Sequence, residues 1–469
     1  MNKRAAIYCL VWTLWVAPVA ARAGQAAAGS WKAGAARRVI TPQQPMWMAG
    51  YASRNHPAEG RSTDLFCKAL LLEDPRGHRG LVITLDLVGI DATLASRWCE
   101  EIHKRWKLTR EQIVLCTSHT HSGPVIVANL KPLHFELLSP EQQQRALQYV
   151  RHLTDQVLGT VEDAMQSVQP ASLSWGSGRA TFAVNRRNNP AAEVPARRKA
   201  GKLVGPFDHD VPVLAVKDGS GRLKAVLFGY ACHATTLAWY YWSGDYPGHA
   251  QLTLEQRYPE CVALFWAGCG GDQNPLPRRT CALAQRYGTE LADAVDEVLL
   301  SKKMQPISGN LTTRFVTFPL AFSRVPTRKE IEGEKESKNR YVAARAKMWL
   351  ARLDQGQQVP STYPYPIGYW KLGEQVEWFS LGGEVVVDYA LRLKDERNGV
   401  RTWVAGYSHD VMAYIPSRRV LSEGGYEGGG AMVYYGFFSP WSETVETDII
   451  NQAQQLAGSA DHLRPIDQR

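Results

Sequence analysis

The sequence predicts an α/β fold in which helices flank a central mixed β-sheet and a β-rich C-terminal half completes a single large domain. Three observations support this fold class. From about residue 37, apolar runs of strand length alternate with segments of helical periodicity. Runs such as residues 81–90 are almost continuously apolar, as expected for strands covered on both faces. No internal repeat or low-complexity linker divides the 469 residues into separate units.

The N-terminus has the three parts of a secretory signal. Lys3 and Arg4 give a positive start, residues 5–20 form an apolar run too short to span a bilayer, and Ala21-Arg22-Ala23 matches an A-x-A cleavage site. The alternative is an uncleaved anchor. We therefore expect a signal peptide at 1–23, a flexible Ala/Gly-rich lead-in at 24–36, and one domain at 37–469 of a secreted or periplasmic protein.

The charge balance argues against a nucleic-acid partner. The formal net charge is +9, and removing the three basic residues of the signal leaves +6. No Lys/Arg run interleaved with aromatic residues is present, as a nucleic-acid-binding surface would require. A modest positive balance favours an acidic substrate or surface, if anything. No stretch beyond the signal is apolar for long enough to cross a membrane, so no integral membrane segment is expected after cleavage.

Seven cysteines remain once Cys9 leaves with the signal. An odd number requires at least one unpaired or intermolecular thiol. No C-x-x-C pair occurs, which argues against a zinc site built from thiolates. One or two disulfides are possible in an oxidising compartment.

The expected elements follow in chain order. Residues 81–90 and 112–116 are strands, and 91–107 is a helix between them. Residues 140–167 form a long helix, with Ser139 as N-cap and Pro140 at the first helical position. The next expected strands are 211–216, 225–233 and 262–268, with helices at 248–258 and 280–300. The C-terminal part should contain a strand at 312–320, an exposed helical excursion at 328–353, a strand, turn and helix within 374–396, a strand at 402–408, and a glycine-rich loop at 421–430 near the site.

Three polar segments follow apolar strands, where sites gather in α/β sheets. They are TSHTHSGP at 117–124, His233 in ACHATT, and GCGGDQNP at 268–275. His119 and His121 would point to opposite faces of an extended segment, so one could bind a metal while the other lines a pocket. A catalytic zinc needs about three protein ligands and an open position. Histidines at two strand ends therefore suggest shared zinc ligation, although a structural role for His233 is equally compatible with the sequence.

Six motifs in the same order resemble the neutral/alkaline non-lysosomal ceramidase family. They are MAGYASR, TSHTHSGP, GYACHATT, SGDYPGHA with AGCGGDQNP, LGGEVVVDYA, and AYIPSRR followed by YEGG. The resemblance extends from about residue 38 to 440, which is nearly the whole chain after the signal. Each motif is short, and their shared order makes the match specific.

The resemblance implies a set of site residues. One zinc ion per chain would be bound by His119, His233, Glu384 and Tyr414. Glu384 and Tyr414 are implied by the resemblance alone, since their surroundings otherwise suggest a helix-start carboxylate and a core aromatic. The catalytic group would include His121, Asn274, Tyr426 and Arg186, with Arg187 as the alternative match for the arginine, and Gly50 and Asp272 would contact substrate.

Two departures from the family pattern bear on function. The family's Gly-Asp-x-Ser-Pro appears here as Gly271-Asp272-Gln273-Asn274-Pro275. A carboxamide cannot act as a serine-type nucleophile, so zinc-activated water is expected to attack, or ceramide is not the substrate. The chain also ends soon after YEGG, so no C-terminal immunoglobulin-like domain is expected.

The sequence thus predicts a secreted zinc-dependent amidohydrolase that acts on the N-acyl amide of ceramide or a similar small-molecule or lipid substrate. A first alternative is a zinc-dependent deacylase or esterase that acts on an acylated sugar or another small substrate. The aromatic-rich segment TLAWYYWSGDY at 236–246 suits sugar rings and acyl chains equally. A second alternative is a non-catalytic binding protein that retains the metal. The sequence assigns no general acid and no oligomeric state.

Overall fold

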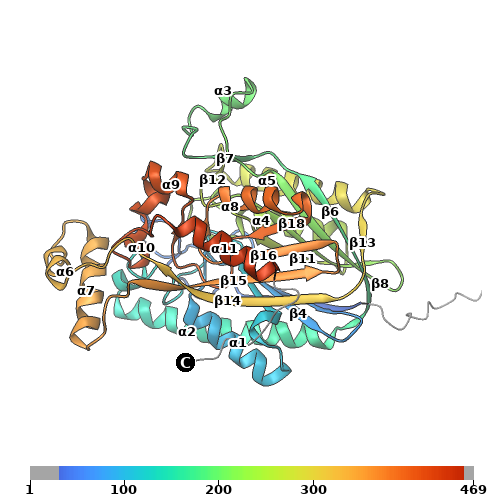
Figure 1. The fold of residues 1–469 in the computed structure, drawn as a ribbon, viewed down its shortest axis with the longest axis horizontal. Helices are drawn as coiled ribbons and strands as arrows, with labels where there is room; N and C mark the ends of the chain where they lie inside the picture. Colours follow the sequence, from blue (N-terminus) through green and yellow to red (C-terminus); the bar gives the residue numbers. More distant parts are fainter. Residues whose placement is uncertain (1–30, 459–469) are drawn as a thin grey trace, which may run out of the picture.

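The computed structural model describes residues 31–458, where a large mixed sheet has helices on one face and a second sheet on the other (Figure 1). The expected signal peptide lies outside the described residues. Eight strands of the large sheet follow the order β11-β9-β8-β6-β1-β3-β4-β5, and β13 pairs with β6. Their bounds are β1 Lys32–Val39, β3 Phe66–Glu73, β4 Arg79–Leu85, β5 Ile113–Thr117, β6 Gln169–Arg179, β8 Asp210–Asp218, β9 Leu223–Tyr230, β11 Val262–Ala267 and β13 Gln305–Ile307.

The large sheet consists of two halves with the same connectivity. In each half, three antiparallel strands are followed by a helix, a parallel strand and a second helix: β1-β3-β4-α1-β5-α2 and β6-β8-β9-α4-β11-α5. The helices are α1 Ala92–Trp106, α2 Pro140–Gln166, α4 Asp245–Arg257 and α5 Cys281–Leu300. The halves meet through antiparallel pairing of β1 with β6. The two halves share this topology without an evident repeat in the sequence.

Residues 405–409 join the two ends of this strand order. Ser408 forms an isolated bridge with Cys116 in β5, and Ala405 forms another with Gly268, directly after β11. The loops that follow β5 and β11 are therefore brought together, although their strands are the last members at opposite ends of the sheet. This junction is where the candidate site lies.

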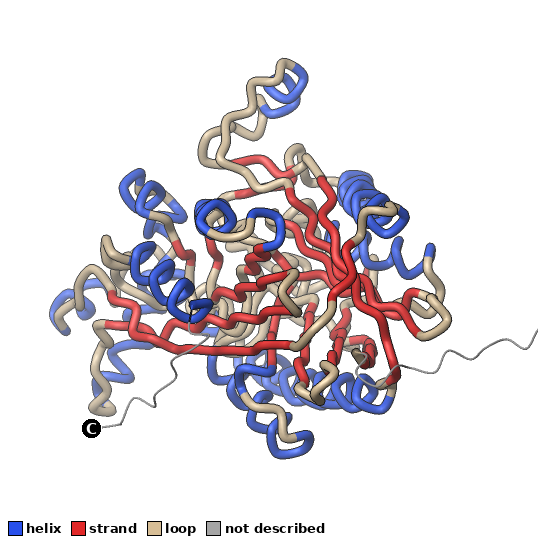
Figure 2. Tube along the Cα trace, turned by 45° about the vertical axis from the view of Figure 1, so that its right-hand side comes forward, coloured by secondary structure: helices blue, strands red, loops and turns tan. Residues whose placement is uncertain are grey.

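The second sheet packs against the face of the large sheet that the helices leave open (Figure 2). Its order is β14-β15-β16-β18, with bounds β14 Leu311–Ala321, β15 Thr362–Leu372, β16 Val376–Leu381 and β18 Thr402–Ala405. Trp370, Trp378 and Trp403 of this sheet pack in one buried cluster with Leu70 and Val82 of the large sheet. The β-rich C-terminal half therefore completes the core, as the sequence predicted.

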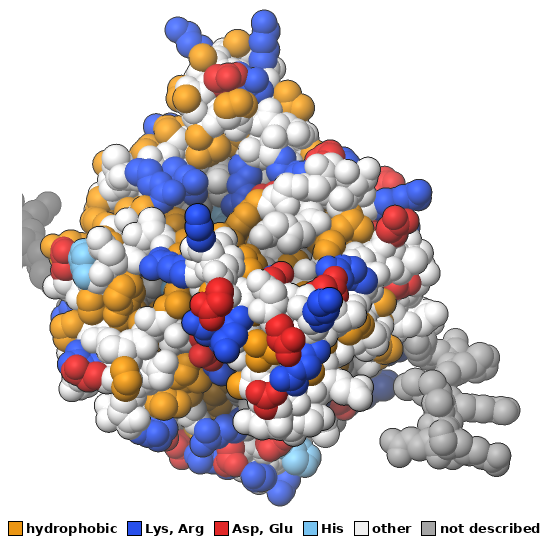
Figure 3. All heavy atoms as spheres, turned by 90° about the vertical axis from the view of Figure 1, so that its left-hand side faces the viewer, with side chains coloured by type: hydrophobic (Ala, Val, Ile, Leu, Met, Phe, Trp, Pro, Cys, Tyr) orange, Lys and Arg blue, Asp and Glu red, His pale blue; other side chains and the backbone are white. Residues whose placement is uncertain are grey.

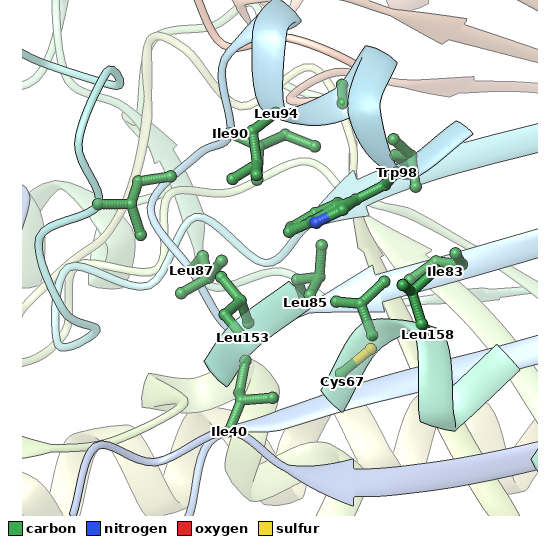
Figure 4. Close-up of a cluster of buried hydrophobic side chains, with 14 of the residues drawn as sticks. Ile40, Cys67, Ile83, Leu85, Leu87, Ile90, Leu94, Trp98, Leu153 and Leu158 are labelled. Carbon is green, nitrogen blue, oxygen red and sulfur yellow. The ribbon is translucent and has the colours of Figure 1, made fainter. Parts of the chain in front are cut away.

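Apart from β1, β6 and β13, the strands of the large sheet are buried on both faces, which explains their continuous apolar character. Ala69 and Leu71 of β3 belong to the cluster beneath α1 and α2, around Trp98 (Figure 4). Leu70 and Leu72 of the same strand belong to the cluster on the opposite face. At about 1.5–3 kcal/mol for each large apolar side chain, burial on both faces is a main source of stability.

The remaining helices and strands lie outside these two sheets. They are β2 Gly60–Arg61, β7 Ala183–Asn185, α3 Val194–Lys199, β10 Tyr241–Trp242, β12 Gln273–Pro275, α6 Arg328–Glu334, α7 Arg340–Asp354, β17 Glu384–Val385, α8 Asp388–Glu396, β19 Tyr414–Ile415, α9 Arg418–Glu423, α10 Met432–Tyr435 and α11 Val445–Gly458. The segment that carries α3 projects from the body of the molecule (Figure 1). No helix among the described residues is long and apolar enough to cross a membrane.

Most of the expected elements are confirmed to within a few residues. The long helix begins at Pro140, and the Ser139 side chain accepts a hydrogen bond from the backbone nitrogen of Gln142, as a helix N-cap does. The strand expected at 81–90 ends earlier, at Leu85, because the chain leaves the sheet to reach the N-terminus of α1.

The structure modifies two of these expectations and shows none of the possible disulfides among the described residues. Within the lead-in expected at 24–36, residues 32–36 lie in β1, whose small residues allow close packing between neighbouring strands and α2. The helical excursion at 328–353 consists of two helices, α6 and α7, separated by residues 335–339. All seven cysteines among the described residues are unpaired, so the possible disulfides do not form in this structure.

The buried carboxyl group of Asp410 should make the stability of this fold depend on pH. Burial raises its pKa to about 7, and the nearby carboxylate of Asp91 adds to the effect. Tyr363 donates a hydrogen bond of 2.6 Å to its Oδ2 atom. The folded-state pKa is raised above the unfolded value of about 3.9. The contribution to stability is therefore fully present below pH 4 and is lost as the pH rises through 7.

We expect Asp410→Asn to flatten this pH dependence. From pH 5 to pH 8 the wild type should lose about 2–3 kcal/mol of unfolding free energy relative to the variant, which carries no titrating group at this position. Urea unfolding at the two pH values measures the difference. Asp395→Asn, at an exposed position on α8, is the matched control and should behave like the wild type. Equal pH dependence in the wild type and Asp410→Asn would contradict the prediction.

Candidate active site

Loops at the ends of β5 and β9 deliver three histidines to one buried point. His119 has a φ of 56°, an uncommon value for a non-glycine residue, which turns the chain sharply after β5. The backbone nitrogen of His121 donates to the carbonyl oxygen of Ala234 at 3.2 Å, tying this turn to the loop after β9. The backbone nitrogen of His233 donates to the carbonyl oxygen of Gln273 at 3.0 Å, tying the same loop to the segment after β11.

Glu384 and Tyr414 reach the same point from the C-terminal half. They lie opposite each other in the parallel pair β17–β19. The Oε2 atom of Glu384 is 3.1 Å from Nε2 of His119 and 3.0 Å from Nε2 of His233. The Tyr414 hydroxyl is 3.2 Å from Nε2 of His233. All four side chains are buried, and all four were named from the sequence as expected zinc ligands.

Hydrogen bonds behind the two imidazoles fix which ring nitrogen carries the proton. Nδ1 of His119 donates to the carbonyl oxygen of Val88, and Nδ1 of His233 donates to that of Gly270 at 2.6 Å. In a neutral imidazole the Nε2 atom then presents a lone pair. Burial lowers the pKa of His233 to about 4, with the Arg186 cation contributing, so this ring is neutral at pH 7.

The converging atoms fit a metal ion. Glu384 Oε2 is buried and receives no hydrogen bond from the described residues, although two Nε2 lone pairs face it. Such an arrangement is repulsive unless a cation lies among the atoms. Donors around a tetrahedral zinc at about 2.0–2.1 Å are separated from one another by about 3.3 Å, close to the separations in this cluster. Backbone carbonyls that orient the ligand histidines are also typical of metal sites.

His121 differs from the other two histidines. Its Nε2 atom is 3.1 Å from Nε2 of His119, but its Nδ1 atom is buried without a hydrogen-bond partner among the described residues. No backbone group therefore fixes its tautomer. Burial, together with His119 and His233, lowers the pKa of His121 well below its usual value, so the ring is neutral. These features suit a ring that exchanges a hydrogen bond with a substrate.

The absence of a side chain at Gly50 leaves room for the ring of His121. Gly50 has a φ of 97°, and a Cβ atom added there would lie 2.5 Å from Cγ and Nδ1 of His121. The Gly50 backbone nitrogen donates to Nε2 of His134 at 2.9 Å. The structure therefore places the His121 ring directly over Gly50, where the sequence analysis expected substrate.

Gly50→Ala is expected to displace His121 and to strain the backbone. The change should cost about 1–3 kcal/mol of unfolding free energy from overpacking, with a further contribution from the positive φ. It should also lower the rate of any reaction that uses His121. Thermal unfolding and activity assays measure both effects. Gly201→Ala is the control for φ alone, because Gly201 has a φ of 65° with open space around it. Equal effects of the two substitutions would contradict the role assigned to Gly50.

Arg186, Asn274 and Tyr426 line a polar wall beside Tyr414. The Arg186 guanidinium donates to the Tyr414 hydroxyl at 3.1 Å and to Oδ1 of Asn274 at 3.3 Å. The Tyr426 ring lies 5.2 Å from that of Tyr414. Because Asn274 Oδ1 accepts from Arg186, the amide nitrogen points the other way, and it donates to none of the described residues. That nitrogen is available to a ligand.

The sequence left open whether Arg186 or Arg187 is the site arginine, and the two residues have different contacts in the structure. Arg186 alone contacts Tyr414 and Asn274. Arg187 instead donates to Glu423 and to the carbonyl oxygen of Gly424. Both pair with Glu427, which is buried, so one carboxylate orients two guanidiniums.

Asp272, which was expected to contact substrate, lies where a substrate does not reach it. Its carboxylate is fully buried and accepts hydrogen bonds from Asn185 Nδ2, Gln273 Nε2 and the backbone nitrogen of Val387 at 2.9–3.0 Å. We therefore assign it a positioning role, since it joins the segment after β11 to those that carry Arg186 and Glu384.

Two tyrosines that the sequence analysis did not identify complete the surroundings. The Tyr435 hydroxyl donates to Oε1 of Glu384, the atom that does not face the histidines. The Tyr407 ring lies 4.3 Å from that of His119, and its hydroxyl is 3.3 Å from Nδ1 of His233. Neither lies in a distinctive pattern of polar residues, and only the tertiary fold brings them close to the histidines.

An open cavity of about 570 Å³ adjoins this cluster. Its lining residues are Arg186, Arg187, Asn189, Ala191, Asn274, Leu276, Arg278, Glu423, Tyr426 and Glu427. Most of them are polar or charged. The cavity gives a small molecule access to Arg186, Asn274 and Tyr426, and through them to Tyr414.

Comparison with known proteins gives a consistent result. Residues 31–275 match the family described as neutral/alkaline non-lysosomal ceramidase, N-terminal. Neutral ceramidase of Pseudomonas aeruginosa is 21% identical over 84% of this chain and 67% of its own length, and neutral ceramidase 1 of Arabidopsis thaliana is 21% identical over 53% of this chain and 32% of its own. This chain thus spans about two thirds of the first relative and one third of the second.

Two solved structures have a similar fold. The crystal structure of neutral ceramidase from Pseudomonas aeruginosa superposes with a TM-score of 0.69 at 18% identity, covering 92% of this chain and 74% of that one. A structure described as ceramidase complexed with C2 gives a TM-score of 0.70 at 17% identity, covering 93% and 77%. At these identities the likeness shows the mixed α/β fold.

Proposed function

The chain belongs to the neutral/alkaline non-lysosomal ceramidase family, and on this basis we propose that it is a zinc-dependent amidohydrolase that cleaves an N-acyl amide bond. The observation that carries the proposal is the convergence of His119, His233, Glu384 and Tyr414 on one buried point, with lone pairs facing one another. These four residues would hold one zinc ion per chain. When bound, zinc supplies a Lewis acid that polarises a carbonyl group and lowers the pKa of water.

The residues around this point have separate roles in the proposed reaction. Neutral His121 can accept or donate one proton at the edge of the cluster. The amide nitrogen of Asn274 can donate to negative charge that develops on the substrate carbonyl oxygen, a contribution of about 3 kcal/mol for each well-placed donor. The Arg186 cation holds Asn274 and Tyr414 in place through two hydrogen bonds. Tyr426, which is half-exposed in the cavity, is placed to contact the substrate.

Asn274 stands where the family pattern has serine, and its surroundings favour a role as donor. Its Oδ1 atom accepts from Arg186 and from Thr235 Oγ1 at 3.4 Å, which leaves only the amide nitrogen for a ligand. We expect Asn274→Ala to lower kcat by about 10²-fold or more through the loss of this donor. Asn274→Ser distinguishes the alternatives in a ceramide hydrolysis assay. A large gain in activity would show that serine was the missing nucleophile and would contradict the donor role.

The walls of the cavity favour a second candidate function, the deacylation of a polar substrate such as an acylated sugar. Apolar side chains contribute little to the lining, which contains Ala191 and Leu276 beside several charged groups. A long acyl chain gains about 0.8 kcal/mol for each CH₂ that it buries, and this lining offers little surface for such burial.

A panel of acylated substrates tests the proposal. Zinc-loaded protein should release free acid from at least one N-acyl compound among acylated sphingoid bases, acylated amino acids and acetylated amino sugars. Cleavage confined to O-acyl compounds would favour an esterase. Stoichiometric zinc without cleavage of any member would favour a non-catalytic binding protein and would overturn the proposal.

We also propose that the protein is exported and loses residues 1–23. The proposal rests on the charged start, the apolar run and the A-x-A pattern at the N-terminus. N-terminal sequencing of the protein recovered from outside the cytoplasm should begin near Gly24. An intact N-terminus on membrane-bound protein would instead indicate an uncleaved anchor.

A further inference from the structure

Two neighbouring arginines lie beside the candidate site, one in the wall of the cavity and one over Tyr51, and neither has an acidic partner among the described residues. Arg278 lines the cavity together with Arg186 and Asn274. The Arg279 guanidinium lies over the ring of Tyr51, 4.9 Å from its centroid. The Tyr51 ring in turn lies 4.7 Å from that of His121. Arg279 is therefore connected to His121 through a single aromatic ring, while Arg278 faces the cavity itself.

A third arginine adds to this positive charge. The Arg54 guanidinium also lies 4.9 Å from the centroid of Tyr51, and it is buried. Its nitrogens donate to backbone carbonyl oxygens, including those of His121 at 2.6 Å and Trp239 at 3.2 Å, and to no carboxylate. Burial raises the pKa of Tyr51, while the positive charges of Arg279, Arg278 and Arg54 lower it.

The carboxylates around these arginines already have other hydrogen-bond or ion-pair partners. Asp245 is fully buried and accepts hydrogen bonds from the backbone nitrogens of Leu237 and Tyr246. On the other side of the cavity, Glu427 and Glu423 pair with Arg186 and Arg187. That side is therefore close to neutral, and the uncompensated charge lies on Arg278 and Arg279. Figure 3 shows Lys and Arg side chains gathered on this face, below the projecting segment that carries α3.

The backbone holds Arg279 in an unusual conformation close to the site. Its φ is 92°, a region that costs a non-glycine residue on the order of 1–3 kcal/mol. Its backbone nitrogen donates to the carbonyl oxygen of Thr236, in the loop that begins at His233. The position of Arg279 is thus coupled to the loop that supplies a proposed zinc ligand.

We propose that Arg278 and Arg279 bind an anionic group of the substrate, so that the protein acts on N-acylated amines that carry a carboxylate, sulfate or phosphate. The inference rests on the proposed amidohydrolase function. The anion lies beside Tyr51, and the scissile amide lies between His121 and Asn274. The oxygen of a water molecule bonds to the acyl carbon as the C–N bond breaks, and one proton of that water passes to the departing nitrogen, which leaves as the amine. Guanidinium groups suit this task because they donate in a fork that matches such anions.

A pair of ligands that differ only in charge tests the inference without turnover. N-(hexylsulfonyl)glycine and its carboxamide resist hydrolysis, and isothermal titration calorimetry gives Kd for each on zinc-loaded protein. The carboxylate should bind about tenfold or more tightly than the carboxamide, as expected for charge-assisted hydrogen bonds. Matching ligands built on taurine and aminomethylphosphonate then rank sulfonate and phosphonate against carboxylate.

Two variants assign the effect to the arginines. Arg278→Gln combined with Arg279→Gly should remove the preference for the anion while changing the affinity for the carboxamide less than about twofold. Glycine adopts a positive φ without penalty, so loss of the fold is not expected. Arg286→Gln, at an exposed arginine of α5 that does not line this cavity, is the matched control and should behave like the wild type.

The outcomes separate this inference from the proposed function. Equal affinities for the charged and neutral ligands, or a preference that survives in the double variant, would overturn the inference. A preference lost in the double variant, in a protein that cleaves no N-acyl compound, would support the anion site while the proposed function fails. Cleavage of N-acyl compounds without any preference for charge would leave the proposed function standing and the inference refuted.

Discussion

Replacing Glu384 by alanine is expected to abolish both metal binding and hydrolysis. Glu384 supplies the only carboxylate of the cluster, and its Oε2 atom is within 3.1 Å of two imidazole nitrogens. Without it, a cation there would lack the negative charge that offsets its burial. A metal site supplies several kcal/mol of transition-state stabilisation, so kcat/KM should fall by about 10³-fold or more. Metal analysis of the purified variant and steady-state kinetics measure the two effects.

Two histidine variants serve as controls for this prediction. His119→Ala should lose metal as Glu384→Ala does, because His119 faces the carboxylate and is oriented by Val88. His121→Ala should retain about one zinc per chain, because no hydrogen bond at Nδ1 orients this ring as a metal ligand. The variant should still lose activity, because His121 is the residue proposed to exchange a proton with the substrate. Loss of metal from His121→Ala alone, with metal retained in His119→Ala, would exchange the roles of the two residues.

Replacing Arg186 by glutamine is expected to have the second largest effect. The Arg186 guanidinium contacts Glu427, Asn274 and Tyr414 at once, and its removal leaves the buried Glu427 carboxylate with Arg187 alone. We expect kcat to fall by about 10²-fold, which is the effect of losing one well-placed hydrogen-bond donor to the transition state. Stability should also fall, by roughly 1–3 kcal/mol for the carboxylate left partly unpaired.

Arg187→Gln is the matched comparison. Arg187 also pairs with Glu427, but it does not reach Tyr414 or Asn274. It should therefore lower stability by a similar amount while changing kcat only a few-fold. Parallel kinetics and denaturant unfolding separate the two effects. If Arg187→Gln lowers kcat as much as Arg186→Gln does, the role assigned to Arg186 is wrong and the alternative match from the sequence gains support.

The fold class and the elements named from the sequence were predictable because local patterns determine them, whereas β1, β3, β6, β15 and α11 were not predicted. Buried strands of the large sheet read as continuous apolar runs, and the N-cap of α2 could be identified from Ser139 and Pro140. The duplicated topology of the sheet could not be predicted, since its halves share pairing order and not residues. The break between α6 and α7 was also missed, because charged residues run through both helices and the segment between them.

The site was predictable in part, for a different reason. Local pattern drew attention to His119, His121 and His233, which follow strands of the large sheet. Glu384 and Tyr414 could be named only through the family resemblance, because no local spacing links residues on separate short strands. Tyr435 and Tyr407 were missed, since both depend on the tertiary packing of the C-terminal half. Arg279 was missed as well, because its unusual backbone conformation is visible only in the structure.

A crystal structure of the purified protein, with data collected on both sides of the zinc absorption edge, tests the central claim most directly. The account predicts one anomalous peak per chain, enclosed by His119 Nε2, His233 Nε2, Glu384 Oε2 and the Tyr414 hydroxyl, with His121 beside it and outside the coordination sphere. A peak that His121 coordinates in place of Tyr414 would revise the ligand set. No anomalous density among these residues in zinc-supplemented crystals would contradict the account.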